Sequence, residues 1–282
     1  MENIEFSIVV PFYNKEKSLD ACIQSLLTQE YPAERYEIIC VNNNSTDNSC
    51  SLVNKYPSVK LIHEKMQGAY AARNAGILQS KGAFIVFTDA DAKVRDSWLR
   101  NIHFEIDKNN YDILIGWYKA ASAGKLLQFH SHFISERIKK AIEQKSISIL
   151  TASACNLIVR KDIFREKGLF LNISRGEDRY FVIRCFEEGY RIGFAEHIEV
   201  ERSDICSVNI ALLKNFIYGY ANAVYVKRVK RKISLLKSIP VTVKFAFRHF
   251  PIGMSLLLFA FFYILGYFLG KTKCCSNRAC TY

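Results

Sequence analysis

The chain has 282 residues, of which 50% are hydrophobic and 23% are charged. This composition is that of a globular protein with a tendency toward membrane contact. Its nine cysteines lack disulfide-framework spacing and include no Cys-X-X-Cys pair for zinc, which excludes a disulfide-stapled scaffold and a zinc ribbon. The net charge of +12 lies in the tail, because residues 201–282 carry 13 Lys and Arg against two Asp and Glu, whereas residues 1–200 carry 26 against 25.

Apolar runs alternate with helical patterns along the front of the chain. Strands are predicted at Ser7–Pro11, Tyr36–Val41, Val59–Ile62 and from Phe84 to the turn at Asp89, and helices at 18–29, 48–56 and 69–79. Farther along, helices are predicted at 96–106 and 181–188, and strands at 111–118 and 191–195. Such alternation with short connections predicts an α/β fold, a mostly parallel mixed sheet with helices on both faces.

Two carboxylates, Asp89 and Asp91, follow the apolar strand that begins at Phe84. Ligands of open α/β sheets collect at the carboxyl ends of the strands, so this turn is placed for a binding site. Two Asp at this spacing can converge on one Mg²⁺, which proteins commonly hold with one or two carboxylates plus substrate phosphates. A solvated turn with two helix-capping acids is the alternative interpretation of an isolated Asp-X-Asp.

Four motifs stand at strand ends or helix starts: Val10-Pro11-Phe12-Tyr13-Asn14, Asn43-Asn44-Ser45-Thr46-Asp47, Gly68 with Ala72-Arg73-Asn74-Ala75-Gly76, and Asp89-Ala90-Asp91. In type, order and spacing they resemble the signatures of family 2 glycosyltransferases, whose fold is the Rossmann-like GT-A fold. The resemblance covers roughly residues 5–200. It includes residues 152–160, which are similar to a strand of the family, and Gly176-Glu177-Asp178, which is similar to the segment carrying the family's catalytic acids. The Gln-X-X-Arg-Trp signature of processive synthases is absent, which favours transfer of a single sugar.

The resemblance implies a role for each motif. Asp91 is expected as the more direct ligand of Mg²⁺ or Mn²⁺, with Asp89 also near the metal and closer to the ribose. Asp178 is expected as the base of an inverting displacement, with Glu177 orienting the acceptor; two acids in the first turn of a helix, favoured by the macrodipole, are the structural alternative. The charge of Arg179 is expected to depress the pKa of Asp178.

The donor's nucleotide is expected to contact Pro11, Tyr13, Asn43 and Arg73. Tyr13 could stack on the base, and Arg73 could contact a phosphate or the base. The family commonly has an Asp where Asn42 and Asn43 stand, and an amide carries no charge with which to read the base. Many relatives also place a His near the metal where this chain has Arg202, so Arg202 is considered as a phosphate contact.

The tail is predicted to associate with a membrane. Residues 250–270 contain no charged side chain, and a span of this length matches the hydrocarbon thickness of a bilayer. The preceding basic segment could lie in the interface and bind anionic phospholipid rather than nucleic acid. The predicted organisation is a GT-A domain at 1–225, a basic amphipathic segment at 226–249, a transmembrane helix at 250–270 and a short tail at 271–282.

The sequence therefore predicts a metal-dependent inverting glycosyltransferase at the cytoplasmic face of the membrane, because no signal peptide precedes the first strand. The expected donor is a UDP-sugar, and the expected acceptor is a glycan or lipid-linked saccharide of the cell surface. Two alternatives stay open. One is a polyprenyl-phosphate sugar synthase, whose phosphate acceptor needs no base, and the other is a non-catalytic nucleotide-binding scaffold.

Overall fold

The structure is a computed structural model that describes residues 4–120, 125–146, 150–173 and 175–202, together with 258, 260–265 and 267–269. The chain divides into two compact units. The sheet unit consists of Met1–Ala121, Thr151–Asn172 and Glu177–Asp204, and the second unit of Ser122–Leu150, Ile173–Gly176 and Ile205–Tyr282. In the second unit the main described element is the helix α5 (Lys125–Glu143).

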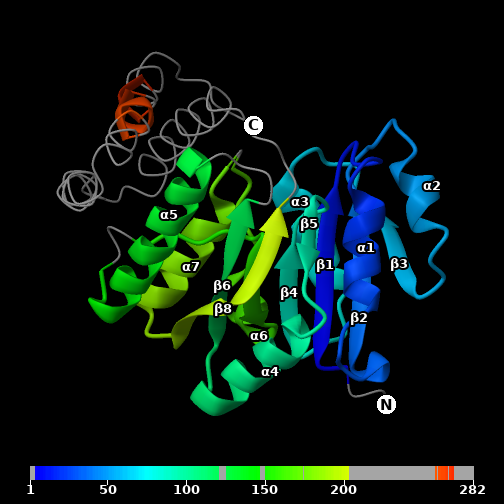
Figure 1. Cartoon of the computed structure of the whole chain (residues 1–282), viewed down its shortest axis with the longest axis horizontal. Coiled ribbons are helices and arrows are strands. Elements are labelled where there is room, and N and C mark those ends of the chain that lie inside the picture. Colours follow the sequence, from blue (N-terminus) through cyan, green and yellow to red (C-terminus); the bar gives the residue numbers. More distant parts are fainter. Residues whose placement is uncertain are drawn as a thin grey trace. The chain divides into compact units, whose positions relative to one another are not determined.

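Within the described residues, eight strands form one mixed sheet in the order β3-β2-β1-β4-β7-β6-β8-β5 (Figure 1). These strands are β1 (Phe6–Phe12), β2 (Tyr36–Asn42), β3 (Val59–His63), β4 (Phe84–Thr88), β5 (Ala92–Val94), β6 (Ile113–Ala120), β7 (Asn156–Arg160) and β8 (Ile192–Arg202). The strands β3, β2, β1 and β4 run parallel, whereas β7 is antiparallel to both of its neighbours. The carboxyl ends of the first four strands therefore meet at one edge.

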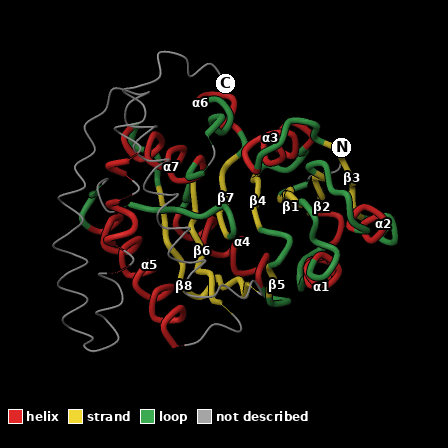
Figure 2. Tube along the Cα trace, turned by 90° about the horizontal axis from the view of Figure 1, so that it is seen from above, coloured by secondary structure: helices red, strands yellow, loops and turns green. Residues whose placement is uncertain are grey.

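Helices cover both faces of the sheet, because both faces of its central strands are apolar. The helices of this unit are α1 (Leu19–Leu27), α2 (Ser49–Val53), α3 (Ala69–Gln79), α4 (Trp98–Asn109), α6 (Asp162–Lys167) and α7 (Glu177–Glu187), with a 3₁₀ turn η1 (Ala33–Arg35). Figure 2 shows α3, α6 and α7 on one face, and α1 and α4 on the other. Residues such as Val9 and Val86 are fully buried as a result.

A cluster of four phenylalanines fixes α7 against the central strand β4. The rings of Phe164 and Phe181 stack with centroids 4.6 Å apart, and Phe170 lies 5.3 Å from Phe87 and 5.2 Å from Phe181. Phe87 precedes Asp89 by two residues, and Phe181 lies one turn after Asp178. This packing therefore holds the start of α7 near the end of β4.

The predicted α/β architecture is confirmed, with differences at particular elements. The helix α7 begins at Glu177 rather than at Phe181. The prediction began too late because the first turn of this helix is polar and shows no apolar periodicity. The strand β8 continues to Arg202 rather than ending at Ala195, since its second half pairs with β6 after an irregularity at Gly116/Trp117 and with β5. The helix α5 and the three-residue β5 were not predicted.

The predicted tail lies largely outside the described residues. The segments 226–249 and 271–282 are not described, and the predicted span 250–270 is described only at helical residues 258, 260–265 and 267–269. Among the residues that are described, none of the helices has the length and apolar character needed to cross a membrane.

Candidate active site

Hydrogen bonds join the loops that follow β1 and β2. The backbone N–H of Asn14 donates to Ser45 Oγ at 3.0 Å, and Asn14 Oδ1 accepts from the N–H of Thr46 at 2.8 Å. The backbone N–H of Lys15 donates to Ser49 Oγ at 2.8 Å. Asn14 has a φ of 50°, a left-handed conformation that Asn tolerates better than most residues. These contacts fix the backbone of Lys15 at the sheet edge where β4 also ends.

Each of the four carboxylate oxygens of Asp89 and Asp91 faces a cationic nitrogen. Asp91 Oδ2 accepts from Lys15 Nζ at 2.5 Å, and Asp91 Oδ1 lies 3.4 Å from Arg202 Nη2. Asp89 Oδ1 accepts from Arg73 Nη2 at 3.0 Å, and Asp89 Oδ2 lies 3.5 Å from Arg202 Nη1. Burial acts to raise the pKa of Asp89, but the charges of Arg202 and Arg73 outweigh it and lower that pKa. Asp89 is therefore ionised at neutral pH.

Arg73 joins the end of β4 to the start of α7. It lies on α3, is 7% exposed, and donates through Nη2 to Asp89 and through Nη1 to Glu177, which is itself 5% exposed. The neighbouring Asn74 exchanges two hydrogen bonds with the backbone of Phe170, at 2.9 and 3.0 Å. One buried guanidinium thus holds together two carboxylates from distant parts of the sequence.

Asp178 lies beside Glu177 in the first turn of α7. Its Oδ2 accepts from the backbone N–H of Ala154 at 2.8 Å, and its Oδ1 accepts from the N–H of Arg179 at 2.7 Å. Burial raises the pKa of Asp178, and Arg73 together with these two hydrogen bonds offsets that effect only in part. The expected depression of this pKa is therefore wrong in its net direction. A raised pKa favours a carboxylate that accepts a proton during a reaction.

The pKa of Glu177 is also raised, by burial and then by the charge of Asp178, while Arg73 acts in the opposite sense. Four carboxylates and three cations lie at this sheet edge, so the formal charge of these seven groups is one negative unit. They are Asp89, Asp91, Glu177 and Asp178 on one side, and Lys15, Arg73 and Arg202 on the other.

The carboxylate pair fits Mg²⁺ or Mn²⁺ in chemistry and in number. Within the described residues, no three His, Cys, Asp or Glu side chains are grouped to hold an ion. A divalent cation held at this turn would have Asp89 and Asp91 as its protein ligands, and water and phosphate oxygens would complete the coordination, as is common for Mg²⁺.

Two of the predicted nucleotide contacts lie at the end of β1. Pro11 occupies the strand opposite Val41 of β2, and Tyr13 follows the strand with 49% of its surface exposed. An exposed ring at this edge can accept a stacked base. Arg73, by contrast, is buried and bound to two carboxylates, so its guanidinium is not open to a phosphate.

Asn43 is occupied by the backbone of a neighbouring loop. Its Nδ2 donates to the carbonyl oxygens of Glu64 and Met66, at 3.0 and 2.7 Å, and its Oδ1 accepts from the N–H of Gly68 at 2.8 Å. Both amide hydrogens are thereby used. The amide of Asn43 therefore fixes the loop that leads into α3, and its N–H groups are not available to hydrogen-bond a base.

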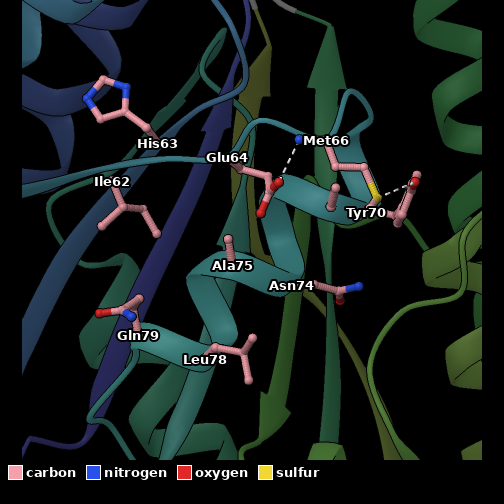
Figure 3. Close-up of a pocket in the computed structure, with 10 residues that line it drawn as sticks. Ile62, His63, Glu64, Met66, Tyr70, Asn74, Ala75, Leu78 and Gln79 are labelled. Carbon is pink, nitrogen blue, oxygen red and sulfur yellow. Dashed lines mark hydrogen bonds between the residues drawn. The ribbon is translucent and has the colours of Figure 1, made fainter.

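That loop forms one wall of a groove of about 540 Å³ between β3 and α3 (Figure 3). Met66, Tyr70 and Leu78 supply apolar lining, and Figure 3 shows Glu64 accepting from the backbone of Met66. None of the four acids described above lines this groove.

Sequence reasoning missed Lys15 and left Arg202 uncertain. Lys15 follows β1 and Asp91 follows β4, so 76 positions of sequence separate them, and no hydrophobic periodicity indicates their contact. Register does place Arg202, because β8 pairs with β5 so that Arg202 lies opposite Ala92, the residue after Asp91. His197, which also lies on β8, is 3.6 Å from Glu105 of α4.

The sequence matches the family model described as Glycosyl transferase family 2 over residues 7–168. Glycosyltransferase AglE of Haloferax volcanii is 28% identical over 200 residues, covering 68% of this chain and 64% of the relative. Poly(ribitol-phosphate) beta-N-acetylglucosaminyltransferase TarS of Staphylococcus aureus is 25% identical over 196 residues, covering 67% of this chain and 34% of the relative. The chain thus spans less than two thirds of the length of these curated relatives.

Solved structures show the same fold. TarS residues 1–349 in complex with UDP-GlcNAc align with a TM-score of 0.58 and 17% identity, covering 99% of this chain and 93% of TarS. The mannosyltransferase PcManGT of Pyrobaculum calidifontis, in complex with GDP-Man and Mn²⁺, aligns with a TM-score of 0.64 and 14% identity, covering 95% and 86%. These matches confirm the predicted GT-A fold.

Replacing Arg73 by Met should destabilise the sheet unit by about 3–5 kcal/mol, because it leaves Asp89 and Glu177 without their shared buried counter-ion. The loss should be larger at pH 8 than at pH 5. Without the guanidinium the folded-state pKa of Glu177, which burial already raises, rises further above its unfolded value, so folded-state stability is lost as the pH rises through that interval. Thermal unfolding at the two pH values measures both effects.

The control for this variant is Arg165→Met on α6, whose side chain is 75% exposed and pairs with Asp162 at 3.3 Å. An exposed pair of this kind contributes about 0–1 kcal/mol, so the control should unfold nearly as the unmodified chain does. Equal unfolding temperatures for the two variants would show that the Arg73 bridge is not a structural requirement.

Proposed function

The chain belongs to glycosyl transferase family 2, and on that premise we propose that it moves one sugar from a nucleotide-diphosphate sugar to a hydroxyl group of an acceptor. The observation that carries the proposal is the Arg73 bridge, which brings the acid pair of α7 to the same sheet edge as Asp89 and Asp91. The proposed metal-binding acids, Asp89 and Asp91, and the proposed base, Asp178, thereby lie at the same sheet edge as the loops that follow β1 and β2.

The proposed reaction is a single displacement with inversion. The acceptor oxygen forms a bond to the anomeric carbon while the bond from that carbon to the diphosphate oxygen breaks, and the nucleoside diphosphate leaves with the electron pair. A Mg²⁺ or Mn²⁺ ion bound by Asp91 and Asp89 would stabilise the charge that develops on the leaving diphosphate. The Mn²⁺ in the PcManGT complex supports this assignment.

Asp178 is proposed as the base that takes the acceptor's proton. The N–H groups of Ala154 and Arg179 hold its two oxygens in place, and each oxygen retains a further lone pair for a proton. Its raised pKa brings the group closer to the pKa that general-base catalysis favours near neutral pH. Glu177 is proposed to hold Arg73 at the start of α7 through their ion pair and to orient the acceptor.

The proposed donor is a UDP-sugar and the proposed acceptor a glycan or lipid-linked saccharide of the cell surface. The TarS complex with UDP-GlcNAc supports the nucleotide, and the poly(ribitol-phosphate) acceptor in the name of TarS supports the class of acceptor. Pro11 and Tyr13 remain the proposed contacts to the base and ribose.

A panel of nucleotide sugars tests the donor assignment. We expect UDP-GlcNAc or UDP-glucose with Mn²⁺ to raise the unfolding temperature, since a ligand at a hundred times its Kd adds about 2.7 kcal/mol of stability. GDP-mannose should have a smaller effect, and EDTA should abolish the stabilisation. Absence of stabilisation by every nucleotide sugar would contradict the proposed function.

Replacing Asp178 by Asn should lower kcat by about 10²- to 10⁴-fold, the usual contribution of a positioned base. Binding of UDP, measured by calorimetry, should change little, because Asp178 contacts neither Asp89 nor Asp91 directly. The control is Asp162→Asn, the same chemical change at an exposed residue of α6, which should retain full activity. A variant of Asp178 that keeps its activity would instead favour a phosphate acceptor, as in a polyprenyl-phosphate sugar synthase.

We also propose that the chain associates with the cytoplasmic face of a membrane through residues 226–270. The support is the sequence itself, a charge-free stretch at 250–270 preceded by Lys227, Arg228, Lys230, Arg231 and Lys232. The chain should co-sediment with vesicles that contain anionic phospholipid, and removal of 226–282 should abolish this. Equal sedimentation of the shortened and unshortened chains would contradict the assignment.

A further inference from the structure

The three cations around Asp89 and Asp91 are not equally able to leave. The side chain of Arg73 is 9% exposed and holds Glu177 as well as Asp89, so its displacement would deprive Glu177 of its cation and leave Asp89 with Arg202 alone. The side chain of Arg202 is 22% exposed and contacts both Asp89 and Asp91. The side chain of Lys15 is 36% exposed and contacts Asp91 through one atom. Lys15 is therefore the cation whose departure disturbs the fewest contacts.

The backbone of Lys15 is fixed while its side chain has room to turn. Its N–H is bound to Ser49 Oγ, and the carbonyl of Lys15 accepts from the N–H groups of Ser18 and Leu19 at 3.0 and 2.9 Å. Four rotatable bonds separate this anchored backbone from Nζ, and the head group is partly in solvent. A lysine held in this way can exchange one anionic partner for another without movement of the loop.

A divalent cation on Asp91 Oδ2 would compete with Lys15 in its present position. Nζ lies 2.5 Å from Asp91 Oδ2, and Mg²⁺ coordinates a carboxylate oxygen at about 2.0–2.1 Å. Two positive centres would then share one oxygen at close range, and their repulsion would act against both.

We propose that Lys15 is a displaceable counter-ion of the metal site. It neutralises Asp91 when no divalent cation is bound, competes with the cation for that carboxylate, and turns to the diphosphate of the donor once the cation occupies Asp91. The inference rests on the proposed function because it requires a divalent cation and a nucleotide at this edge.

The test is Mn²⁺ binding to the 282-residue chain without nucleotide, measured by electron paramagnetic resonance of free Mn²⁺ and by calorimetry. Replacing Lys15 by Met should tighten Mn²⁺ binding about two- to fivefold, the range expected for removal of one partly exposed ion pair. Lys15→Arg should bind Mn²⁺ like the unmodified chain because it keeps the charge. Lys17→Met, the same change at an exposed lysine two residues away, is the matched control and should leave the affinity unchanged.

The second measurement is UDP binding at saturating Mn²⁺. Lys15→Met should bind UDP about two- to fivefold more weakly, because the lysine that would turn to the diphosphate is missing. The factor by which UDP tightens Mn²⁺ should fall correspondingly. Lys15→Gln, which keeps a polar head group, should give the same two shifts and guards against an unfolded Met variant, with thermal unfolding verifying the fold of each.

The outcomes separate the two proposals. If the chain binds Mn²⁺ and UDP but Lys15→Met and Lys15→Gln leave both affinities unchanged, the role of Lys15 is wrong and the proposed function stands. If Mn²⁺ affinity falls in these variants, Lys15 assists Mn²⁺ binding rather than competing with it, and the inference is overturned. If the unmodified chain binds neither Mn²⁺ nor UDP, both proposals are overturned.

Discussion

The buried guanidinium of Arg73 is the contact on which the arrangement of the acids depends. Charged groups are rarely buried without a partner, and breaking a buried pair leaves an uncompensated charge in a medium of low polarity. Here one side chain neutralises Asp89 from the end of β4 and Glu177 from the start of α7. The two segments are brought together by apolar packing, but their acids would repel each other without the cation between them.

Apolar and polar contacts therefore have separate tasks at this edge. The phenylalanine cluster of Phe87, Phe164, Phe170 and Phe181 sets the distance between β4 and α7. Asn74 fixes α3 to the backbone of Phe170, so that Arg73 projects between the two elements. The pKa of the Asp178 carboxylate is then raised by burial, which depends on the packing around it and not on the residues next to it in the sequence. Its expected chemistry is a property of the packed unit rather than of the motif.

The sequence predicts the first half of this fold well because each strand there is an apolar run bounded by turn residues. It also places Asp89 and Asp91 correctly after β4, since a strand end can be recognised locally. The environment of Asn43 could not be predicted, because the motif does not reveal that Glu64, Met66 and Gly68 use its amide. The contact between Lys15 and Asp91 was equally hidden, as it depends on the neighbouring positions of β1 and β4 in the sheet.

The presence of Arg202 in place of a histidine changes what the site can do with a metal ion. A neutral imidazole can ligate a cation, whereas a guanidinium is always charged and has no free lone pair to donate. Pairing of β8 with β5 fixes Arg202 opposite Ala92, so this cation stays beside both carboxylates. The protein then offers a divalent cation two carboxylates that already face positive charge. Under the proposed function, tight metal binding would therefore require additional anionic ligands, which a nucleoside diphosphate would supply, so that the metal and the donor would depend on each other at this edge of the sheet.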